Sequence, residues 1–460
     1  MEVRGVTKEK KSLFDERLGR YQAAIALEPT DRVPIATGSN SFAEVYSGNN
    51  HQETIYDAEK WLEAELAFCR AFPEVDVLRN NRVWGPLYDA VDLKTYRLPG
   101  RDLPSQSPFQ FVEKEYMLVD EYDLLIKNPL EFMFDKWLPR IIGEFKEKGS
   151  IRSYMAFLKG GMAQALVAQI MKNRSLRLQE EVGMPQPMTG AFLAPFDALA
   201  DALRGLTGSL TDTYRQPEKV IAACDVLTLE MANFALATAD PFRRYPIFVP
   251  THKATFLSPA QFDKFYWPSF KRTMEILIAA GYKIRAYLEG NWGHHWHHFL
   301  ELPKGTVLCD IDNQGDVFKA KKEIGHHQCI SGGIQASQFI IGTPEEMRER
   351  VKVLCDELAP GGGYIINGGC NFPHDTKKEN FRAMIDAVME FGVYDPRVKP
   401  QPQPAPIAKP MTAFPYPKMA TPWAVKKAEL GSVQGDEDLV RRPWEQLESM
   451  AYIWLWQWTM

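Results

Sequence analysis

The sequence predicts an α/β fold, in the form of a single (β/α)8 (TIM) barrel with a helical insertion and a C-terminal extension. Three observations lead to this fold class. Eight short apolar runs are spread along the 460 residues, and a helical pattern follows each of them. Strands that alternate with helices pair in parallel. Eight such units in a chain of this length favour closure of the sheet into a barrel.

The predicted elements divide the chain into three regions. Residues 1–31 form an N-terminal helical extension, and residues 32–395 form the barrel. The eight predicted strands are Val33–Thr37, Val75–Leu78, Met188–Leu193, Tyr245–Val249, Ile284–Leu288, Thr306–Ile311, Cys329–Ile334 and Tyr364–Asn367. The second and third strands lie too far apart for one crossover, so residues 82–187 are expected to hold an inserted, mostly helical segment beside the active site.

Residues 396–460 form the third region, a proline-rich C-terminal extension. Proline is dense from Pro396 to Pro422, which predicts an extended, semi-rigid chain. The tail ends in Trp454-Leu-Trp-Gln-Trp458, and alternating tryptophans would line one face of an extended segment. Large apolar patches rarely stay exposed. That face therefore packs on the chain's own barrel or forms the subunit interface of a homo-oligomer.

Composition narrows the class of protein. A net charge of −5 and a pI near 6.1 give no basic footprint for a nucleic-acid partner. No stretch reaches the roughly 18–20 apolar residues of a membrane span. The first residues lack the apolar region of a secretion signal. Six cysteines scattered over a large chain indicate reduced thiols, so we expect a cytoplasmic protein with no membrane partner.

Cys370 stands between an apolar run and a predicted helix. The run Tyr364–Ile366 predicts a buried strand, and the glycines after it allow a tight turn. Thr376 and Glu379 then predict the capped start of a helix. Substrates and ligands meet a barrel at the carboxyl ends of its strands. Cys370 is therefore a candidate metal ligand, and the alternative is a small buried hydrophobe.

The passage Gly-Cys-x-x-Pro followed by Glu-Asn resembles the last strand and loop of the uroporphyrinogen decarboxylase superfamily. Further matches are Glu28-Pro-Thr-Asp-Arg-Val-Pro34, Tyr214-Arg-Gln-Pro-Glu-Lys-Val220, Leu257-Ser-Pro-Ala-Gln-Phe262 and Gly342-Thr-Pro-Glu-Glu-Met347. The chain looks most like the branch of zinc-dependent methyltransferases that work with corrinoid proteins. The resemblance implies a (β/α)8 barrel, a zinc ion with Cys370 as ligand, and a cobalamin-type corrinoid held by a separate partner protein.

The chain departs from that branch at the end of the fifth strand. The methyltransferases carry His-x-Cys there, whereas Tyr287 stands at the histidine position and Glu289 at the cysteine position. A carboxylate can bind zinc beside histidine and cysteine, so Glu289 is a candidate ligand. Its alternative is an ion-pair partner or general base. Tyr287 and Glu289 are both candidate catalytic residues by position.

Histidines cluster directly after this strand. Four of the nine histidines of the chain lie at 294, 295, 297 and 298. In a helix, His294 would share a face with His297 and His298, which makes either a metal face or a solvated helix start. In one interpretation, His294 or His295 replaces the metal-binding histidine whose position Tyr287 occupies.

His252 offers a second replacement. It follows the fourth strand, which neighbours the fifth, so His252 should approach Glu289 at the barrel mouth. Its side chain is a candidate metal ligand, acid or base, or a hydrogen-bonded packing histidine. We favour His252 over the 294/295 pair because it ends a strand directly.

The rest of the predicted mouth suits a small organic substrate. The candidate substrate-binding residues are Asn40, Phe42, Arg79, Phe196, Asp312 and Gln335. They combine aromatic, amide and charged groups, as small-molecule pockets do.

These observations predict an enzyme, a methyltransferase component that moves a methyl group between a small methylated or methoxylated compound and a corrinoid protein, with zinc at the barrel mouth. Because the His-x-Cys pair is lost, a second hypothesis is a metal-free member of the superfamily that binds a small ligand or scaffolds a corrinoid complex. A uroporphyrinogen-type decarboxylase is the third hypothesis. Those enzymes hold a polyanionic tetrapyrrole through arginines after the first strand, and residues 38–46 contain no arginine.

Overall fold

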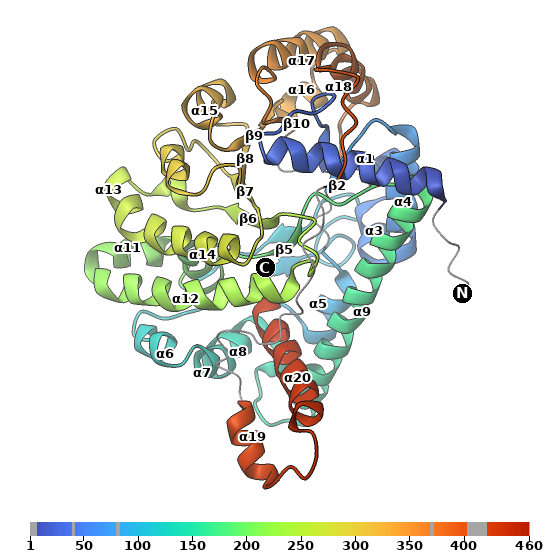
Figure 1. Cartoon of the computed structure of the whole chain (residues 1–460). Helices are drawn as coiled ribbons and strands as arrows, with labels where there is room; N and C mark the ends of the chain where they lie inside the picture. The colour runs from blue at the N-terminus through green and yellow to red at the C-terminus, as the bar shows by residue number, and fades with distance from the viewer. Residues whose placement is uncertain (1–6, 39–41, 80–82, 369–371, 403–420, 460) are drawn as a thin grey trace.

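The computed structural model describes residues 7–38, 42–79, 83–368, 372–402 and 421–459. Helices surround a set of parallel strands, with α1 (Lys8–Ile25) lying across one end of them (Figure 1). Six strands form one parallel sheet in the order β10-β9-β8-β7-β6-β5. They are β5 (Thr189–Ala191), β6 (Ile247–Thr251), β7 (Ile284–Leu288), β8 (Val307–Ile311), β9 (Cys329–Gly333) and β10 (Tyr364–Asn367).

Two further strands, β1 (Ala36–Gly38) and β2 (Val77–Arg79), pair in parallel as a separate sheet. All eight strands overlap the eight predicted positions. The α/β class and the parallel pairing of the predicted strands are therefore confirmed.

The two sheets are joined by short contacts. Ile35 and Ile366 form an isolated parallel bridge, and the Ile366 amide donates to Pro34 O at 3.0 Å. On the other side, the Leu78 amide donates to Pro185 O at 3.3 Å. Neither contact is a ladder among the described residues, so closure into a complete barrel stays a prediction.

Helices follow most of the strands. They are α2 (Phe42–Tyr46), α3 (His51–Tyr56), α4 (Ala58–Ala71), α10 (Pro195–Asp197), η3 (Ala198–Leu203), α11 (Leu206–Arg215), α12 (Pro217–Thr238), α13 (Pro259–Gln261), η5 (Phe262–Tyr266), α14 (Trp267–Ala279), α15 (Val317–Ile324), α16 (Ala336–Ile340), α17 (Pro344–Leu358) and α18 (Lys378–Phe391). Thr343 and Glu346 form the capping box of α17. Thr376 caps no helix: its hydroxyl donates to Pro373 O at 2.7 Å and α18 begins two residues later, which corrects the predicted cap.

The segment between β2 and β5 contains mostly helices. They are α5 (Gly85–Val91), α6 (Tyr122–Lys127), α7 (Pro129–Phe132), η1 (Met133–Trp137), α8 (Leu138–Ile141), η2 (Gly143–Phe145) and α9 (Ile151–Val182), with the short antiparallel pair β3 (Tyr96–Arg97) and β4 (Gln110–Phe111). The 32-residue α9 runs along one side of the molecule, from near α1 toward the lower end in Figure 1.

α12 corrects the expectation that no stretch is apolar enough for a membrane span. It is the one described helix that is long and apolar enough, but 67% of its apolar window is buried. It contacts β5, α14 and α20 (Glu437–Gln457) within the chain. Burial by protein on this scale identifies a core helix.

The tail is a helix rather than an extended segment. α20 begins at Asp436, whose side chain accepts from the Asp438 amide, and it continues through Trp454 and Trp456. Trp454 and Trp458 therefore lie one turn apart, with ring centroids separated by 5.8 Å. Trp454, Trp456 and Trp458 are all buried within this chain. The expectation of alternating tryptophans on an extended face was wrong.

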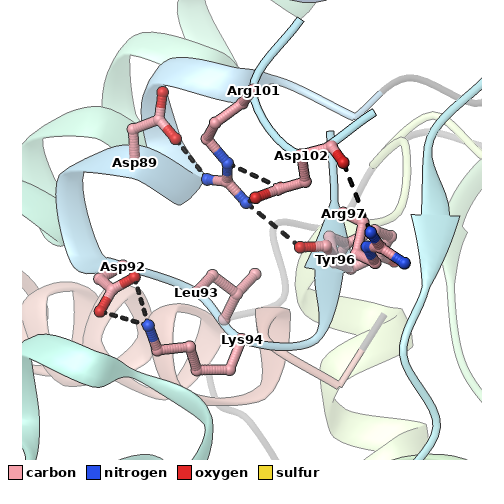
Figure 2. Close-up of a pocket in the computed structure, with 8 residues that line it drawn as sticks. All are labelled: Asp89, Asp92, Leu93, Lys94, Tyr96, Arg97, Arg101 and Asp102. Atoms are coloured by element: carbon pink, nitrogen blue, oxygen red, sulfur yellow. Dashed lines mark hydrogen bonds and ion pairs between the residues drawn. The ribbon is translucent and has the colours of Figure 1, made fainter. Parts of the chain in front are cut away.

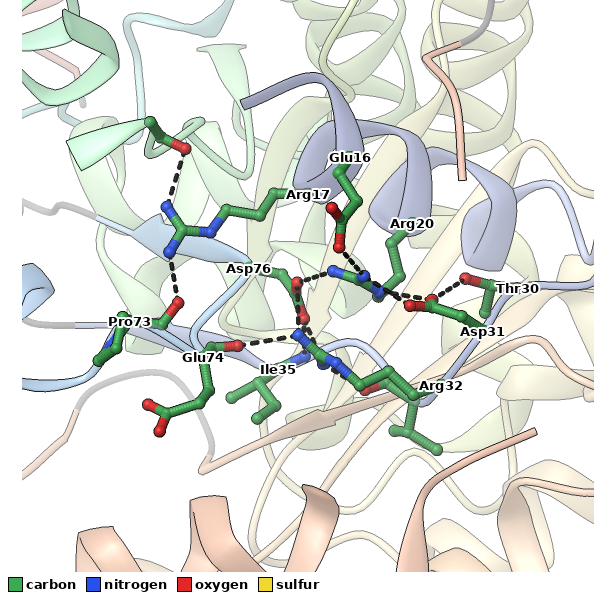
Figure 3. Close-up of polar contacts among 12 residues, drawn as sticks. Glu16, Arg17, Arg20, Thr30, Asp31, Arg32, Ile35, Pro73, Glu74 and Asp76 are labelled. Atoms are coloured by element: carbon green, nitrogen blue, oxygen red, sulfur yellow. Dashed lines mark hydrogen bonds and ion pairs between the residues drawn. The ribbon is translucent and has the colours of Figure 1, made fainter. Parts of the chain in front are cut away.

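A buried charge network lies just before the first two strands (Figure 3). Asp76 is fully buried and binds two guanidinium groups, Arg20 at 2.5 Å and Arg32 at 2.8 Å. Its Oδ2 also accepts from the Ile35 amide at 2.8 Å. Arg20 reaches Asp31 through two 2.6 Å bonds. The segment Glu28–Pro34 thus fixes α1 and β1 to the start of β2.

Candidate active site

A carboxylate–imidazole–carboxylate line stands at the carboxyl ends of β6 and β7. His252 follows β6, and its Nδ1 lies 2.6 Å from Asp201 Oδ2. Its other ring nitrogen, Nε2, lies 3.8 Å from Oε2 of Glu289, which follows β7. The His252 and Glu289 side chains are 35% and 50% exposed, so both can meet a ligand from solution. The predicted approach of His252 to Glu289 is what the structure has.

Asp197 holds the backbone beside the Asp201–His252–Glu289 line. Its carboxylate is fully buried and accepts from the backbone amides of His252 and Lys253, at 3.1 and 2.9 Å. Tyr266 Oη donates to the same carboxylate at 2.7 Å. These bonds fix the turn after β6 and so fix the position of the His252 ring.

The electrostatics of the line favour a charged imidazole. Burial lowers the pKa of His252, but the hydrogen bond to Asp201 and the charges of Asp201, Asp197 and Glu289 raise it to about 9. Burial raises the pKa of Glu289 above its ordinary value, against the opposing effect of His252. Burial and the Asp201 charge also raise the pKa of Asp197. His252 is therefore a charged imidazolium at neutral pH.

Lys253 adds a second cation. Its Nζ lies 2.9 Å from Asp201 Oδ1 and 3.0 Å from Glu113 Oε2. Asp201 is thus shared by His252 and Lys253, which holds its carboxylate in one orientation. That orientation directs His252 Nε2 away from Asp201.

Tyr287 has a hydrogen-bond partner beside this line. Its Oη donates to Asp312 Oδ1 at 2.5 Å, and Asp312 Oδ2 accepts from the Gly290 amide at 2.9 Å. Gly290 has a φ of +80°, which suits glycine in the tight turn after β7. The turn brings Glu289 and the Tyr287–Asp312 pair to the same strand end.

The other predicted substrate-binding residues lie in different surroundings. Phe42 and Phe196 are 2% and 0% exposed, and each packs against other aromatic rings. Arg79 is buried with its guanidinium 4.6 Å from the centroid of the Phe248 ring. Gln335 is exposed and forms the N-terminal cap of α16. Gln335 lines a pocket together with Asp312, whereas Phe42, Phe196 and Arg79 lie in packed surroundings. Substrate binding by these residues stays a prediction.

Two predicted site residues, Asn40 and Cys370, lie outside the described residues.

The histidine cluster does not form the predicted helical face. η6 (Trp296–Glu301) is a 3-10 helix, and His294 lies in the turn before it, exposed. His295 is 4% exposed and stacks on Phe262 with ring centroids 4.0 Å apart. Burial, with the neighbouring histidines, lowers the pKa of His295 to about 4. His298 Nε2 lies 3.0 Å from Asp263 Oδ1, and its Nδ1 lies 3.0 Å from Glu301 Oε1.

Sequence reasoning missed Asp201 and Lys253. Asp201 lies in η3, 51 residues before His252, and a lone aspartate in a helix gives no signal of its own. It also missed His51, which is 4% exposed and bonds Glu44 through Nδ1 at 2.9 Å. Its Nε2 is buried and has no hydrogen-bond partner among the residues that the structure describes. Glu44 is the third residue of α2, which follows β1, and this places the pair near the carboxyl end of that strand.

Two of the described residues have side chains that could hold a metal ion. His252 Nε2 and Glu289 Oε2 are donors of the right kind, and Asp201 on Nδ1 is the outer carboxylate that metal-binding histidines usually have. Within the described ranges, no group of three histidine, cysteine, aspartate or glutamate side chains is placed to hold a metal ion. A third protein ligand would have to come from elsewhere, and Cys370 is the sequence candidate.

A separate pocket lies between α5 and β3, lined by Asp89, Asp92, Leu93, Lys94, Tyr96, Arg97, Arg101 and Asp102 (Figure 2). Arg101 pairs with Asp89 and Asp102, and Lys94 pairs with Asp92. Its volume is about 400 Å³. Because these charges already satisfy one another, the pocket presents a weaker case for ligand binding than the His252 site.

Known proteins resemble the chain in sequence and in fold. The family model for uroporphyrinogen decarboxylase (URO-D) matches residues 168–391. The uroporphyrinogen decarboxylase of Pseudoalteromonas translucida is 26% identical over 137 residues, which cover 29% of this chain and 38% of that protein. That of Actinobacillus succinogenes is 26% identical over 87 residues, 19% of this chain and 24% of that protein. The alignments thus span well under half of these relatives.

In three dimensions, the chain superposes on a methyltransferase from Methanosarcina mazei with a TM-score of 0.55. The superposition covers 82% of this chain and 98% of that structure, at 16% identity. At that identity the similarity establishes the fold.

Proposed function

Since residues 168–391 form a uroporphyrinogen decarboxylase family domain, we propose that the chain is a methyltransferase component of that superfamily. It would move a methyl group between a small methylated or methoxylated compound and a corrinoid protein, in the cytoplasm. The observation that carries the proposal is the line Asp201–His252–Glu289 at the carboxyl ends of β6 and β7. The structural similarity to a methyltransferase supports it.

The chemistry of demethylation explains why such a line is useful. When the bond between a methyl carbon and oxygen breaks, both electrons stay on oxygen, and a proton or a cation must neutralise them. His252 holds a proton on Nε2, kept there by Asp201 and Glu289. Asp201 orients the ring, and Asp197 fixes the backbone beneath it. His252 can therefore protonate the leaving heteroatom.

Zinc is the second way to neutralise that charge. His252, Glu289 and Cys370 are the residues we propose as its ligands. Zinc bound there would act as a Lewis acid toward the substrate heteroatom. Metal ligation requires a deprotonated Nε2, so zinc and the Nε2 proton exclude each other.

A decarboxylase is the second candidate, because the matched relatives carry that name. Residues 38–46 contain no arginine to bind a tetrapyrrole with many carboxylates. Turnover of uroporphyrinogen by the purified protein would establish this candidate in place of methyl transfer. A metal-free binding or scaffold protein is the third candidate, and the replacement of the His-x-Cys pair by Tyr287 and Glu289 favours it.

Glu289→Gln tests the proposed site, with Glu275→Gln on α14 as the control because that carboxylate is exposed away from the mouth. Zinc content by elemental analysis and methyl transfer to cob(I)alamin from methoxylated and methylated donors are measured together. We expect Glu289→Gln to lose both metal and turnover, at least tenfold, because the amide is a weaker ligand. Full metal content with lost turnover would instead make Glu289 a base.

Cys370→Ala and His252→Ala complete the experiment. Loss of zinc in both variants supports the proposed ligand set. If the wild-type protein holds no zinc and Cys370→Ala leaves methyl transfer intact, the metal part of the proposal fails. If no donor is demethylated by wild-type protein, the methyltransferase proposal fails as a whole.

A further inference from the structure

The first half of α9 presents a wide apolar face to solvent. Ile151, Met155, Leu158 and Met162 recur at spacings of four, three and four residues, which is the seam that one helix offers to another. Their exposed fractions are 82%, 49%, 55% and 65%. Two more exposed side chains flank the seam: Tyr154 and Leu166.

The opposite side of the same helix is covered by its own chain. Ala156 is fully buried, and Gly160 lies against Val91 and Trp454. Phe157 touches the Trp454 ring with centroids 4.3 Å apart. α9 is therefore anchored along one side, and its seam points away from the body of the molecule.

The size of the face matches that of a subunit interface. Six large apolar side chains, each about half exposed or more, offer on the order of 700 Å² of surface, and a standard interface buries about 800 Å² on each partner. The largest apolar patch on a typical monomer is about 300–600 Å². The α9 face therefore exceeds what monomers usually expose.

A second apolar surface lies close to the first. α19 (Trp423–Leu430) and the first half of α20 form a helical arm that projects from the lower end of the molecule (Figure 1). Trp423 Nε1 donates to Glu437, and Trp444 Nε1 donates to Thr421 O, both at 2.9 Å, so the two helices hold each other. The outer side of the arm exposes Val425, Leu430, Leu439, Val440, Leu447 and Met450.

Charge distinguishes two ways in which two copies could meet. The stretch 151–170 of α9 carries two charged residues, Arg152 and Lys159, and Arg152 already pairs with Glu144 of its own chain. The arm helices carry five acidic and four basic residues, a net charge of −1. Packing the arm on α9 would therefore place Lys159 against a surface of small net negative charge. Antiparallel α9 against α9, centred on Leu158, would bring the two Lys159 side chains together.

We propose that this chain forms a two-fold homodimer in which the α19–α20 arm of each copy packs on the α9 face of the other. Such a reciprocal exchange closes with two equivalent contacts and leaves no unpaired face. The interface lies on α9 and the arm, not on the buried tryptophans of the tail. It is independent of the proposed methyl transfer, because none of its residues belongs to the His252 site.

The mass of the full chain in solution, from sedimentation equilibrium at micromolar concentration, tests the dimer. We expect twice the 52.4 kDa of one chain. The α9 variant is Leu158→Glu with Met162→Glu, and the arm variant is Leu439→Glu with Leu447→Glu. Each should raise the dimer dissociation constant at least tenfold with unchanged circular dichroism. The control, Tyr214→Glu on α11, removes a 77% exposed aromatic ring and should leave the dimer intact.

Mixing the two variants tests the geometry. In a mixed dimer, the α9 variant contributes a wild-type arm and the arm variant contributes a wild-type α9. These two surfaces form one intact contact, so mixing the variants should restore dimers. No recovery on mixing would overturn the exchange. A wild-type monomer would overturn the dimer, and binding of that monomer to phosphatidylglycerol vesicles would identify a lipid surface as the occupant instead.

Discussion

Asp201 controls the charge of the candidate active site through one hydrogen bond. Its carboxylate lies 2.6 Å from His252 Nδ1 and contributes, with Asp197 and Glu289, to the raised pKa of that imidazole. Asp201→Asn removes the negative charge but keeps the shape. The pKa of His252 should then fall from about 9 toward the ordinary value of about 6.5, because the remaining carboxylates oppose burial less effectively.

The His252 pKa is measured by NMR titration of the imidazole signals in the wild-type protein and the variant. Asp225→Asn serves as the control, since Asp225 is an exposed residue of α12 that pairs with Arg272. An unchanged His252 pKa in Asp201→Asn would mean that Asp201 does not set the charge of the site.

Single residues explain why the site was only partly predictable. Glu289 and His252 follow neighbouring strands, so strand order alone predicted their approach. Asp201 comes from a helix far away in sequence, and only the folded chain brings it to His252. His295 follows the same strand end as Glu289 but turns into a stack with Phe262, because the segment after β7 forms a 3-10 helix.

At the scale of elements, the junction of α1, β1 and β2 depends on Asp76. Arg20 and Arg32 both bind it, and all three side chains are 10% exposed or less. Asp76→Asn leaves two guanidinium groups buried without their shared carboxylate. Removing one member of a buried ion network costs about 3–5 kcal/mol. We expect a loss of that size in the free energy of unfolding by urea, with Asp395→Asn, an exposed residue paired with Arg397, causing little change.

The same junction gives a pH dependence through Asp31. Burial raises the pKa of Asp31, but hydrogen bonds and charge from Arg20 hold it below its ordinary value. A carboxyl whose pKa is lower in the folded state stabilises the fold above the unfolded pKa of about 3.9, and that contribution is lost as pH falls through the folded pKa. Urea unfolding should therefore show stability falling below about pH 4, and Asp31→Asn should flatten that fall. An equal fall in the variant would assign the acid sensitivity to other carboxyls.

The elements also mark where sequence patterns mislead. β7 and β10 have the predicted bounds, because a short apolar run buried on both faces identifies a parallel strand. The tryptophans at 454, 456 and 458 alternate as in a strand, yet α20 contains the first two and Trp458 is its C-terminal cap. A period of two over five residues is too short to outweigh a helix already formed.

At the scale of the whole molecule, eight predicted strands are present but their closure is uneven. β7 has a ladder on each side, with β6 and with β8. Among the described residues, β2 has a ladder with β1 alone, and its contact toward β5 is the bond from the Leu78 amide to Pro185 O. Sequence patterns identify strands but not how many hydrogen bonds join neighbouring strands. That number depends on strand register and on the twist of the sheet.

The junction between β2 and the segment before β5 should therefore open more readily than the rest of the sheet. Amides held by one bond at a sheet edge exchange through small local openings, whereas amides inside a double ladder need a larger one. We expect the hydrogen-exchange protection factor of the Leu78 amide to be at least about tenfold lower than those of the β7 amides. Exchange measured by NMR or mass spectrometry checks this, with β8 as a second double-ladder control. Equal protection of Leu78 and β7 would mean that the strands close into a complete barrel, in which the junction beside β2 is as stable as the neighbouring ladders.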